Sequence, residues 1–172
     1  FLATQLITYL GNKRTLLPVI GKAVSKIQNK LGGKKLRILD LFSGTGVVAR
    51  YLKQFSELLI TNDLESYSLV TNQCYLTNKS KISTDLLIDT LYHLRRDISR
   101  NLIEGFITEL YSPKDDTRIT KSERAFYTRR NAIYLDSARS AIDRLPIELR
   151  KFFLAPLLSQ ASIHTNTSGV FK

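Results

Sequence analysis

The stretch "LRILDLFSGTGVVARYL", residues 36–52, constrains the fold more than any other part of the sequence. Its apolar, β-branched run predicts a strand over residues 37–42, and residues 46–55 carry a helical pattern. Gly44 and Gly46 lie between them, where missing side chains permit a sharp turn and a close approach of a ligand to backbone N–H groups. Together these features predict a parallel α/β unit that binds a ligand at the carboxyl edge of its sheet.

Flanking segments extend this unit and then give way to helices. A helix is expected over residues 16–31, a second strand over 57–63 and another helix over 66–78. Beyond residue 82 the strand signals fade, and helical spacing alternates with the polar stretch "SPKDDTRITKS". We therefore expect three segments: a cofactor-binding α/β part over 1–82, a helical insertion over 83–150, and a return to the α/β core over 151–172.

Two ligand classes fit the glycine turn. Gly44, Gly46 and Ala49 satisfy the pattern G-x-G-x-x-G/A, which predicts a dinucleotide and leaves a nicotinamide-dependent oxidoreductase open. However, Asp40 stands just before the turn, where it would repel a pyrophosphate and would attract a sulfonium or ammonium group, both present in S-adenosylmethionine. Asp63 follows about 17 residues after the turn, at the end of the second strand, where a carboxylate can accept hydrogen bonds from ribose hydroxyls.

Composition limits the class of binding partner and the cellular compartment that we expect for this protein. The formal net charge is +11, from 26 basic and 15 acidic residues among 172, which favours a polyanion such as DNA and equally suits a basic protein kept in solution by its charge. A non-catalytic nucleic-acid-binding module therefore stays open. The single Cys74 and the lack of a long apolar run predict a cytoplasmic protein without a membrane span. No metal-ligand spacing is present, so no metal site is expected.

Three motifs in order resemble a known family. The stretch "DLFSGTG" resembles the F-x-G-x-G motif of amino-type DNA methyltransferases, and "ITYLGNKRTLLPVI" resembles the N-terminal motif of the D12 class of adenine-N6 DNA methyltransferases. "NDLESYS" falls where that family keeps its ribose-binding acid. The resemblance implies a Rossmann-like, S-adenosylmethionine-dependent fold and methylation of a flipped adenine in double-stranded DNA. It further implies a restriction-modification system, with a cognate endonuclease acting on the same site.

The resemblance also assigns roles to residues. Tyr9 and Lys13 would meet the methionine end of the cofactor, although a core aromatic and a surface lysine would look the same in the sequence. Arg129 and Arg130, in a basic segment with interleaved aromatic residues, would contact DNA phosphates. The implied cofactor-binding residues are Tyr9, Lys13, Asp40, Phe42, Ser43, Gly44, Thr45, Gly46, Asp63 and Leu64.

No catalytic residue is expected within these 172 residues. Enzymes of this kind use an Asp/Asn-Pro-Pro-Tyr motif that accepts hydrogen bonds from the target amine and stacks on the flipped base. The four prolines here are never adjacent to one another: Pro18, Pro113, Pro146 and Pro156. We expect the motif beyond Lys172, the chain to be part of a longer protein, and this chain alone to transfer no methyl group.

Overall fold

The structure is a computed structural model that describes residues 13–166. It is a mixed α/β chain that forms two compact units, residues 1–81 and 82–172, and each unit is described by itself. The described elements of the first unit are η1 (Lys13–Leu16), α1 (Leu17–Lys30), β1 (Leu36–Asp40), α2 (Val47–Leu52), η2 (Lys53–Phe55), β2 (Ser56–Thr61), α3 (Ser66–Tyr75) and η3 (Lys79–Lys81).

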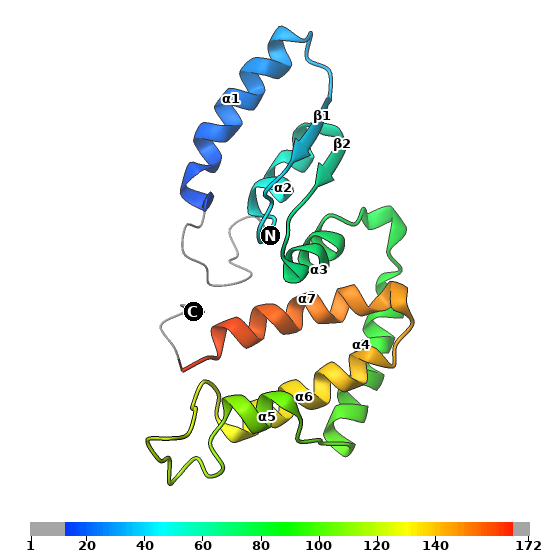
Figure 1. The fold of residues 1–172 in the computed structure, drawn as a ribbon. Helices are drawn as coiled ribbons and strands as arrows, with labels where there is room; N and C mark the ends of the chain where they lie inside the picture. The colour runs from blue at the N-terminus through cyan, green and yellow to red at the C-terminus, as the bar shows by residue number, and fades with distance from the viewer. Residues whose placement is uncertain (1–12, 167–172) are drawn as a thin grey trace. The chain divides into compact units, whose positions relative to one another are not determined.

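The predicted strands form a parallel pair, as the strand–helix–strand pattern indicates (Figure 1). The register runs from Leu36 opposite Ser56 to Asp40 opposite Thr61, and both strands end two residues earlier than predicted. Helix α2 packs against both strands and against α1. Side chains alternate along β1, so that Ile38 is half-buried and Leu39 is exposed.

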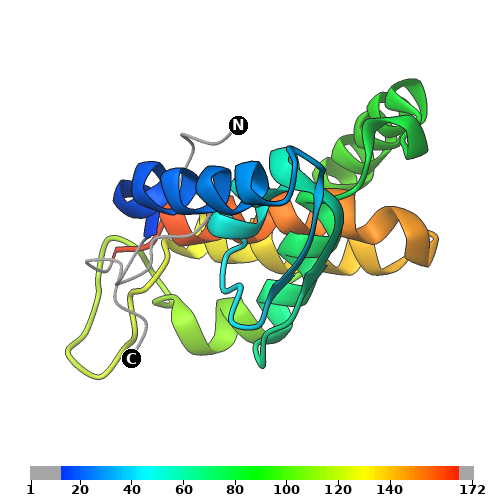
Figure 2. The same ribbon diagram turned by 90° about the horizontal axis from the view of Figure 1, so that it is seen from above.

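Every described secondary-structure element of the second unit is a helix. Helices α4, α6 and α7 pack on one another, and Figures 1 and 2 show α6 and α7 running side by side. Its elements are α4 (Thr84–Arg100), α5 (Phe106–Tyr111), α6 (Arg129–Asp143) and α7 (Ile147–Ile163). The buried core of this bundle consists of Leu94, Ile98, Ala138, Ala141 and Ile142. The functional division into 83–150 and 151–172 stays a prediction.

Helix boundaries in this unit differ from the sequence expectation. The helical pattern over residues 84–111 is interrupted between α4 and α5, and the helix expected from residue 123 begins only at Arg129. The Thr128 hydroxyl accepts the N–H of Asn131 at 3.3 Å, which caps the first turn of α6 and fixes its start. No helix in the described part of the chain is long and apolar enough to cross a membrane.

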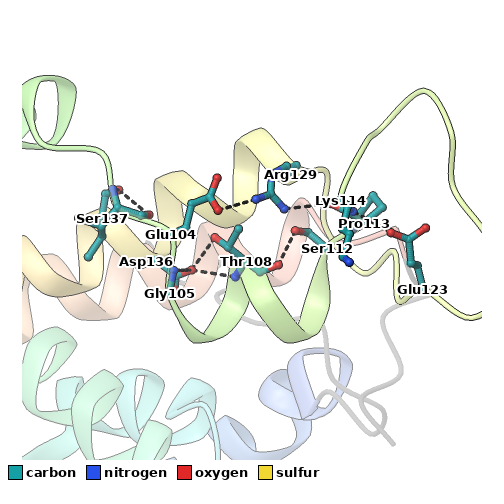
Figure 3. A network of polar contacts seen from close by, with 11 residues as sticks. Glu104, Gly105, Thr108, Ser112, Pro113, Lys114, Glu123, Arg129, Asp136 and Ser137 are labelled. Carbon is teal, nitrogen blue, oxygen red and sulfur yellow. Dashed lines mark hydrogen bonds and ion pairs between the residues drawn. The ribbon is translucent and has the colours of Figure 1, made fainter.

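A buried carboxylate on α6 holds the beginning of α5. Asp136 accepts the N–H groups of Gly105 and Thr108 at 3.0 and 2.8 Å (Figure 3) and that of Ile107 at 3.0 Å. It also accepts the Thr108 hydroxyl at 2.7 Å. The first N–H groups of a helix have no partner within the helix, and α5 has no side-chain cap of its own. Asp136 therefore supplies from α6 the cap that α5 lacks.

Replacing this carboxylate should loosen α5. Asp136→Ala leaves three backbone N–H groups and one hydroxyl without their acceptor, and we expect it to lower the free energy of unfolding by about 2–4 kcal/mol. Asp143→Ala is the matched control, because that acid forms an exposed pair with Arg139 and should cost less than about 0.5 kcal/mol. Denaturant unfolding measures both values. Equal losses in the two variants would contradict this role of Asp136.

Candidate functional site

The glycine turn continues the hydrogen bonding of the two strands. Beyond the last paired residues, the N–H of Asn62 donates to the carbonyl of Asp40 at 2.8 Å. The N–H of Ser43 then donates to the carbonyl of Asn62 at 3.0 Å. These bonds draw the segment after β2 alongside the turn after β1, so Asp63 lies next to Gly44.

Asp63 ties the turn to the start of the next segment. Its carboxylate accepts the N–H of Gly44 at 2.7 Å and the N–H of Glu65 at 3.0 Å. The bonds from Glu65 and Gly44 lower the pKa of Asp63, because both favour its charged form. Each of its oxygens also has a second acceptor position, and the side chain is only half-buried. An ionised acid with spare acceptor capacity thus stands beside the turn.

Asp40 has the opposite electrostatic character. Burial raises the pKa of its carboxyl, while the charge of Lys13 and the N–H of Phe42 act in the lowering direction and the charge of Asp63 adds to the increase. Within residues 13–166, its Oδ2 atom is buried and finds no hydrogen-bond partner. A desolvated carboxylate oxygen without a donor is costly, and a cationic group brought to it would remove that cost.

The other residues predicted to bind the cofactor differ in how they relate to Asp40 and Asp63. Lys13 is exposed, and its charge acts on both Asp40 and Asp63. Phe42 and Leu64 point to solvent, with 78% and 97% of their surface exposed. Thr45 is half-buried, and the predicted Tyr9 lies outside the described residues.

Ser43 and two residues that sequence reasoning missed form a buried polar cluster behind the turn. The Asn72 amide donates to the hydroxyls of Ser43 and Ser68, each at 3.0 Å, and the Ser43 hydroxyl also bonds the carbonyl of Asn62 at 3.1 Å. All three clustered side chains are less than 10% exposed. The cluster fastens α3 to the turn, so the Ser43 side chain supports the turn from behind.

Asn72 also explains why residue 46 is glycine. Gly46 has a left-handed φ of 74°, and a Cβ there would lie 2.2 Å from the Asn72 Oδ1 atom. Gly44 shares the left-handed conformation, with φ 51°, but its added Cβ would meet no atom of the described residues within 4 Å. Space for a ligand therefore exists at Gly44, while Gly46 is closed by the cluster.

The two predicted DNA-binding arginines lie in different surroundings. The Arg129 guanidinium pairs with Glu104 and donates to the carbonyl of Pro113 at 3.4 Å (Figure 3). Its backbone N–H donates to the carboxylate of Asp116 at 2.9 Å. Arg130 is exposed. Arg129 thus holds the loop before α6 in place, and Arg130 is the member of the pair that faces solvent.

In that loop, residues 112–128, acidic side chains accept hydrogen bonds from N–H groups of the loop's own backbone. Glu123 accepts the N–H groups of Lys114 and Thr120, both at 2.9 Å, and these bonds lower its pKa to about 2. Asp115 accepts the N–H of Thr117 at 2.8 Å. The loop is therefore shaped by internal hydrogen bonds although it contains no helix or strand. Among the described residues, no cluster of His, Cys, Asp or Glu could hold a metal ion.

Comparison with known proteins gives one family. The family model of D12 class N6 adenine-specific DNA methyltransferases matches residues 9–172. The modification methylase StsI of Streptococcus sanguinis is 32% identical over 175 residues, which cover 95% of this chain and 25% of that protein. The type II methyltransferase M.CviAII of Paramecium bursaria Chlorella virus 1 is 30% identical, covering 96% of this chain and 48% of that protein. No solved structure is similar enough to count as a match.

These matches bear on the alternatives that the sequence left open. The type II methyltransferase M.NlaIII of Neisseria lactamica, at 29% identity, likewise covers 95% of this chain and 47% of its own length. The chain thus spans between a quarter and a half of the relatives named. A nicotinamide-dependent oxidoreductase and a non-catalytic nucleic-acid-binding module find no support in these matches.

The two glycines of the turn should respond differently to a methyl group. Gly44→Ala and Gly46→Ala both incur the left-handed backbone cost of roughly 1–2 kcal/mol, but only Gly46→Ala also collides with Asn72. We expect Gly46→Ala to lower the free energy of unfolding further than Gly44→Ala. In an Asn72→Ala background the additional loss should shrink, because the colliding atom is gone. Denaturant unfolding of the four variants tests this, and equal costs at both glycines would show that the Asn72 contact is unimportant.

Proposed function

The chain belongs to the D12 class of N6 adenine-specific DNA methyltransferases, and from this premise we propose that the full-length protein transfers a methyl group to the N6 atom of adenine in duplex DNA. S-adenosylmethionine is the proposed methyl donor. The names of the relatives, modification methylases and type II methyltransferases, support a place in a restriction-modification system beside a cognate endonuclease. The proposal places the protein in the cytoplasm with its DNA.

The buried, unpartnered Oδ2 atom of Asp40 is the observation that carries the cofactor assignment. When bound, S-adenosylmethionine supplies an activated methyl group on a positively charged sulfonium, and its methionine part carries an ammonium group. Either cation would give this oxygen a partner, whereas a pyrophosphate would be repelled. Asp40 therefore favours S-adenosylmethionine over a nicotinamide dinucleotide at the glycine turn.

Other residues near the turn suit the remaining parts of the cofactor. Asp63 is ionised and has spare acceptor positions, which suit two ribose hydroxyls. The Lys13 ammonium suits the methionine carboxylate as a charged donor. The left-handed Gly44 leaves room for the ligand beside the backbone. Phe42 and Leu64 expose apolar surface on the same two segments. In this proposal, these residues bind and orient the cofactor, and none of them transfers a proton.

The same proposal includes a larger Rossmann-like sheet in the full-length protein. Parallel sheets of α/β proteins have both faces covered, and their strands are correspondingly apolar on both faces. In the first unit, Leu39, Leu58 and Ile60 are between 39% and 55% exposed. These three side chains leave one face of the two-stranded sheet apolar and exposed. This supports the proposal that further elements of the full-length protein pack on that face.

We assign target recognition to the helical segment 83–150. Its loop over residues 112–128 is held by internal hydrogen bonds, so it can meet DNA without first becoming ordered. Arg130 is exposed and suits a phosphate contact, while Arg129 supports the loop through the carbonyl of Pro113. Base flipping and stacking on the target adenine belong to the Asp/Asn-Pro-Pro-Tyr motif, which this chain lacks, so this chain alone should transfer no methyl group.

Methyl transfer by the full-length protein tests the function, and Asp40→Asn tests the site. Nucleoside mass spectrometry of duplex DNA incubated with S-adenosylmethionine should detect N6-methyladenine. In Asp40→Asn the cofactor affinity should fall tenfold or more, about 1.4 kcal/mol, because the attraction for the cation is lost.

The stability of the unbound Asp40→Asn protein provides the second measurement. Burial raises the pKa of Asp40, so the charged form is disfavoured in the folded state and a neutral amide should not lower the unfolding temperature.

Methylcytosine as the only product would contradict the adenine assignment. Undiminished cofactor affinity in Asp40→Asn would contradict the role of Asp40.

A further inference from the structure

The N-terminal part of the sequence has an unbalanced charge. No acidic residue occurs before Asp40, whereas eight basic residues precede it: Lys13, Arg14, Lys22, Lys26, Lys30, Lys34, Lys35 and Arg37. In the second unit, by contrast, some arginines pair with nearby acids, as Arg139 pairs with Asp143 one helical turn away. Surfaces that serve only solubility normally intersperse both signs of charge. The imbalance therefore points to an anionic partner for this part of the molecule.

Helix α1 gathers part of this charge on one side. Lys22, Lys26 and Lys30 follow one another at intervals of four residues, so they lie on the same side of the helix over about 12 Å. All three are exposed, and they line one open groove whose other lining residues are Pro18, Gly21, Ser25, Asn29 and Tyr51. We call these three lysines the α1 lysine face.

The packing of α1 keeps this face toward solvent. Gly21 is buried, and a Cβ there would lie 2.1 Å from the Tyr51 hydroxyl oxygen, so α2 fits closely against the helix at this point. Leu17, one turn earlier, is buried on the same side. Because Leu17 and Gly21 face the interior of the unit, the α1 lysine face remains exposed to solvent.

The α1 lysine face carries a cost that the described residues do not offset. Like charges four residues apart on a helix repel one another, and this face contains two such neighbouring pairs. No ion pair to any of the three lysines is formed within residues 13–166. A partner that presents negative charges along a line would relieve this repulsion.

We propose that the α1 lysine face contacts the phosphates of duplex DNA, as a second DNA surface located on the cofactor-binding unit. The lysines are about 6 Å apart along the helix and span about 12 Å, so their flexible side chains can reach several phosphates of a duplex at once. Ser25 and Asn29 add short hydrogen-bonding groups beside them. The inference rests on the proposed function, since it takes duplex DNA as the substrate.

The salt dependence of DNA binding by the full-length protein tests this proposal. Lys22→Gln, Lys26→Gln and Lys30→Gln together should reduce the slope of log affinity against log salt by up to about 2.7, allowing about 0.9 for each lost phosphate contact. The same three positions changed to Arg should keep the parent slope, since the charges remain. Affinity for S-adenosylmethionine should be unchanged in both triple variants, which verifies that the first unit is folded.

A second control separates a local contact from net charge. Lys79→Gln with Lys81→Gln removes two exposed charges from η3 and should leave the slope unchanged. An equal loss of slope per lysine in this control would overturn the proposal, as would a parent-like slope in the Gln triple variant. Loss of binding to anionic phospholipid vesicles with DNA binding intact would assign the face to a membrane and equally overturn it. A parent protein that does not bind duplex DNA at all would instead refute the proposed function.

Discussion

The carboxylate of Asp63 joins two segments that the sequence separates by about 20 residues, and the candidate site depends on this link. By accepting the N–H of Gly44 at 2.7 Å and that of Glu65 at 3.0 Å, it holds the glycine turn against the end of β2. The strand pair and the cluster of Ser43, Ser68 and Asn72 hold the turn from its other sides. The charged group proposed to bind the ribose is thus the same group that shapes the turn.

In both units, carboxylates hold the chain in place by accepting hydrogen bonds from backbone N–H groups. In the second unit, Asp136 supplies acceptors to the start of α5, and Glu123 does so within the loop before α6. These acids accept hydrogen bonds from backbone N–H groups, and in this way they hold segments of the chain that no helix or strand contains.

The sequence predicted the first unit well because its signals are local. An apolar strand, two glycines and a helical pattern follow one another within residues 36–52, and the parallel strand pair confirms this prediction. Contacts between distant residues gave no such signal. Asn72 lies in an ordinary helical pattern, and only the folded chain places its amide on Ser43, 29 positions away.

The helical unit was predicted less accurately for a similar reason. Apolar spacing continues across residues 101–105, and the break there depends on Asp136, which is about 30 positions away and captures the N–H groups of the next helix. Arg129 looked like a free surface cation in the sequence, yet Glu104 pairs with it from the segment before α5. The Thr128 cap of α6 was missed as well, because the helical pattern was predicted to begin at residue 123.

The central claim is that the glycine turn between Asp40 and Asp63 holds S-adenosylmethionine. Calorimetric titration of the full-length protein with S-adenosylmethionine and, separately, with NAD tests it most directly. The account predicts a single site that binds S-adenosylmethionine, weakens in Asp63→Ala and shows no heat of binding with NAD. Saturable binding of NAD, or S-adenosylmethionine binding that is unaffected by Asp63→Ala, would contradict it.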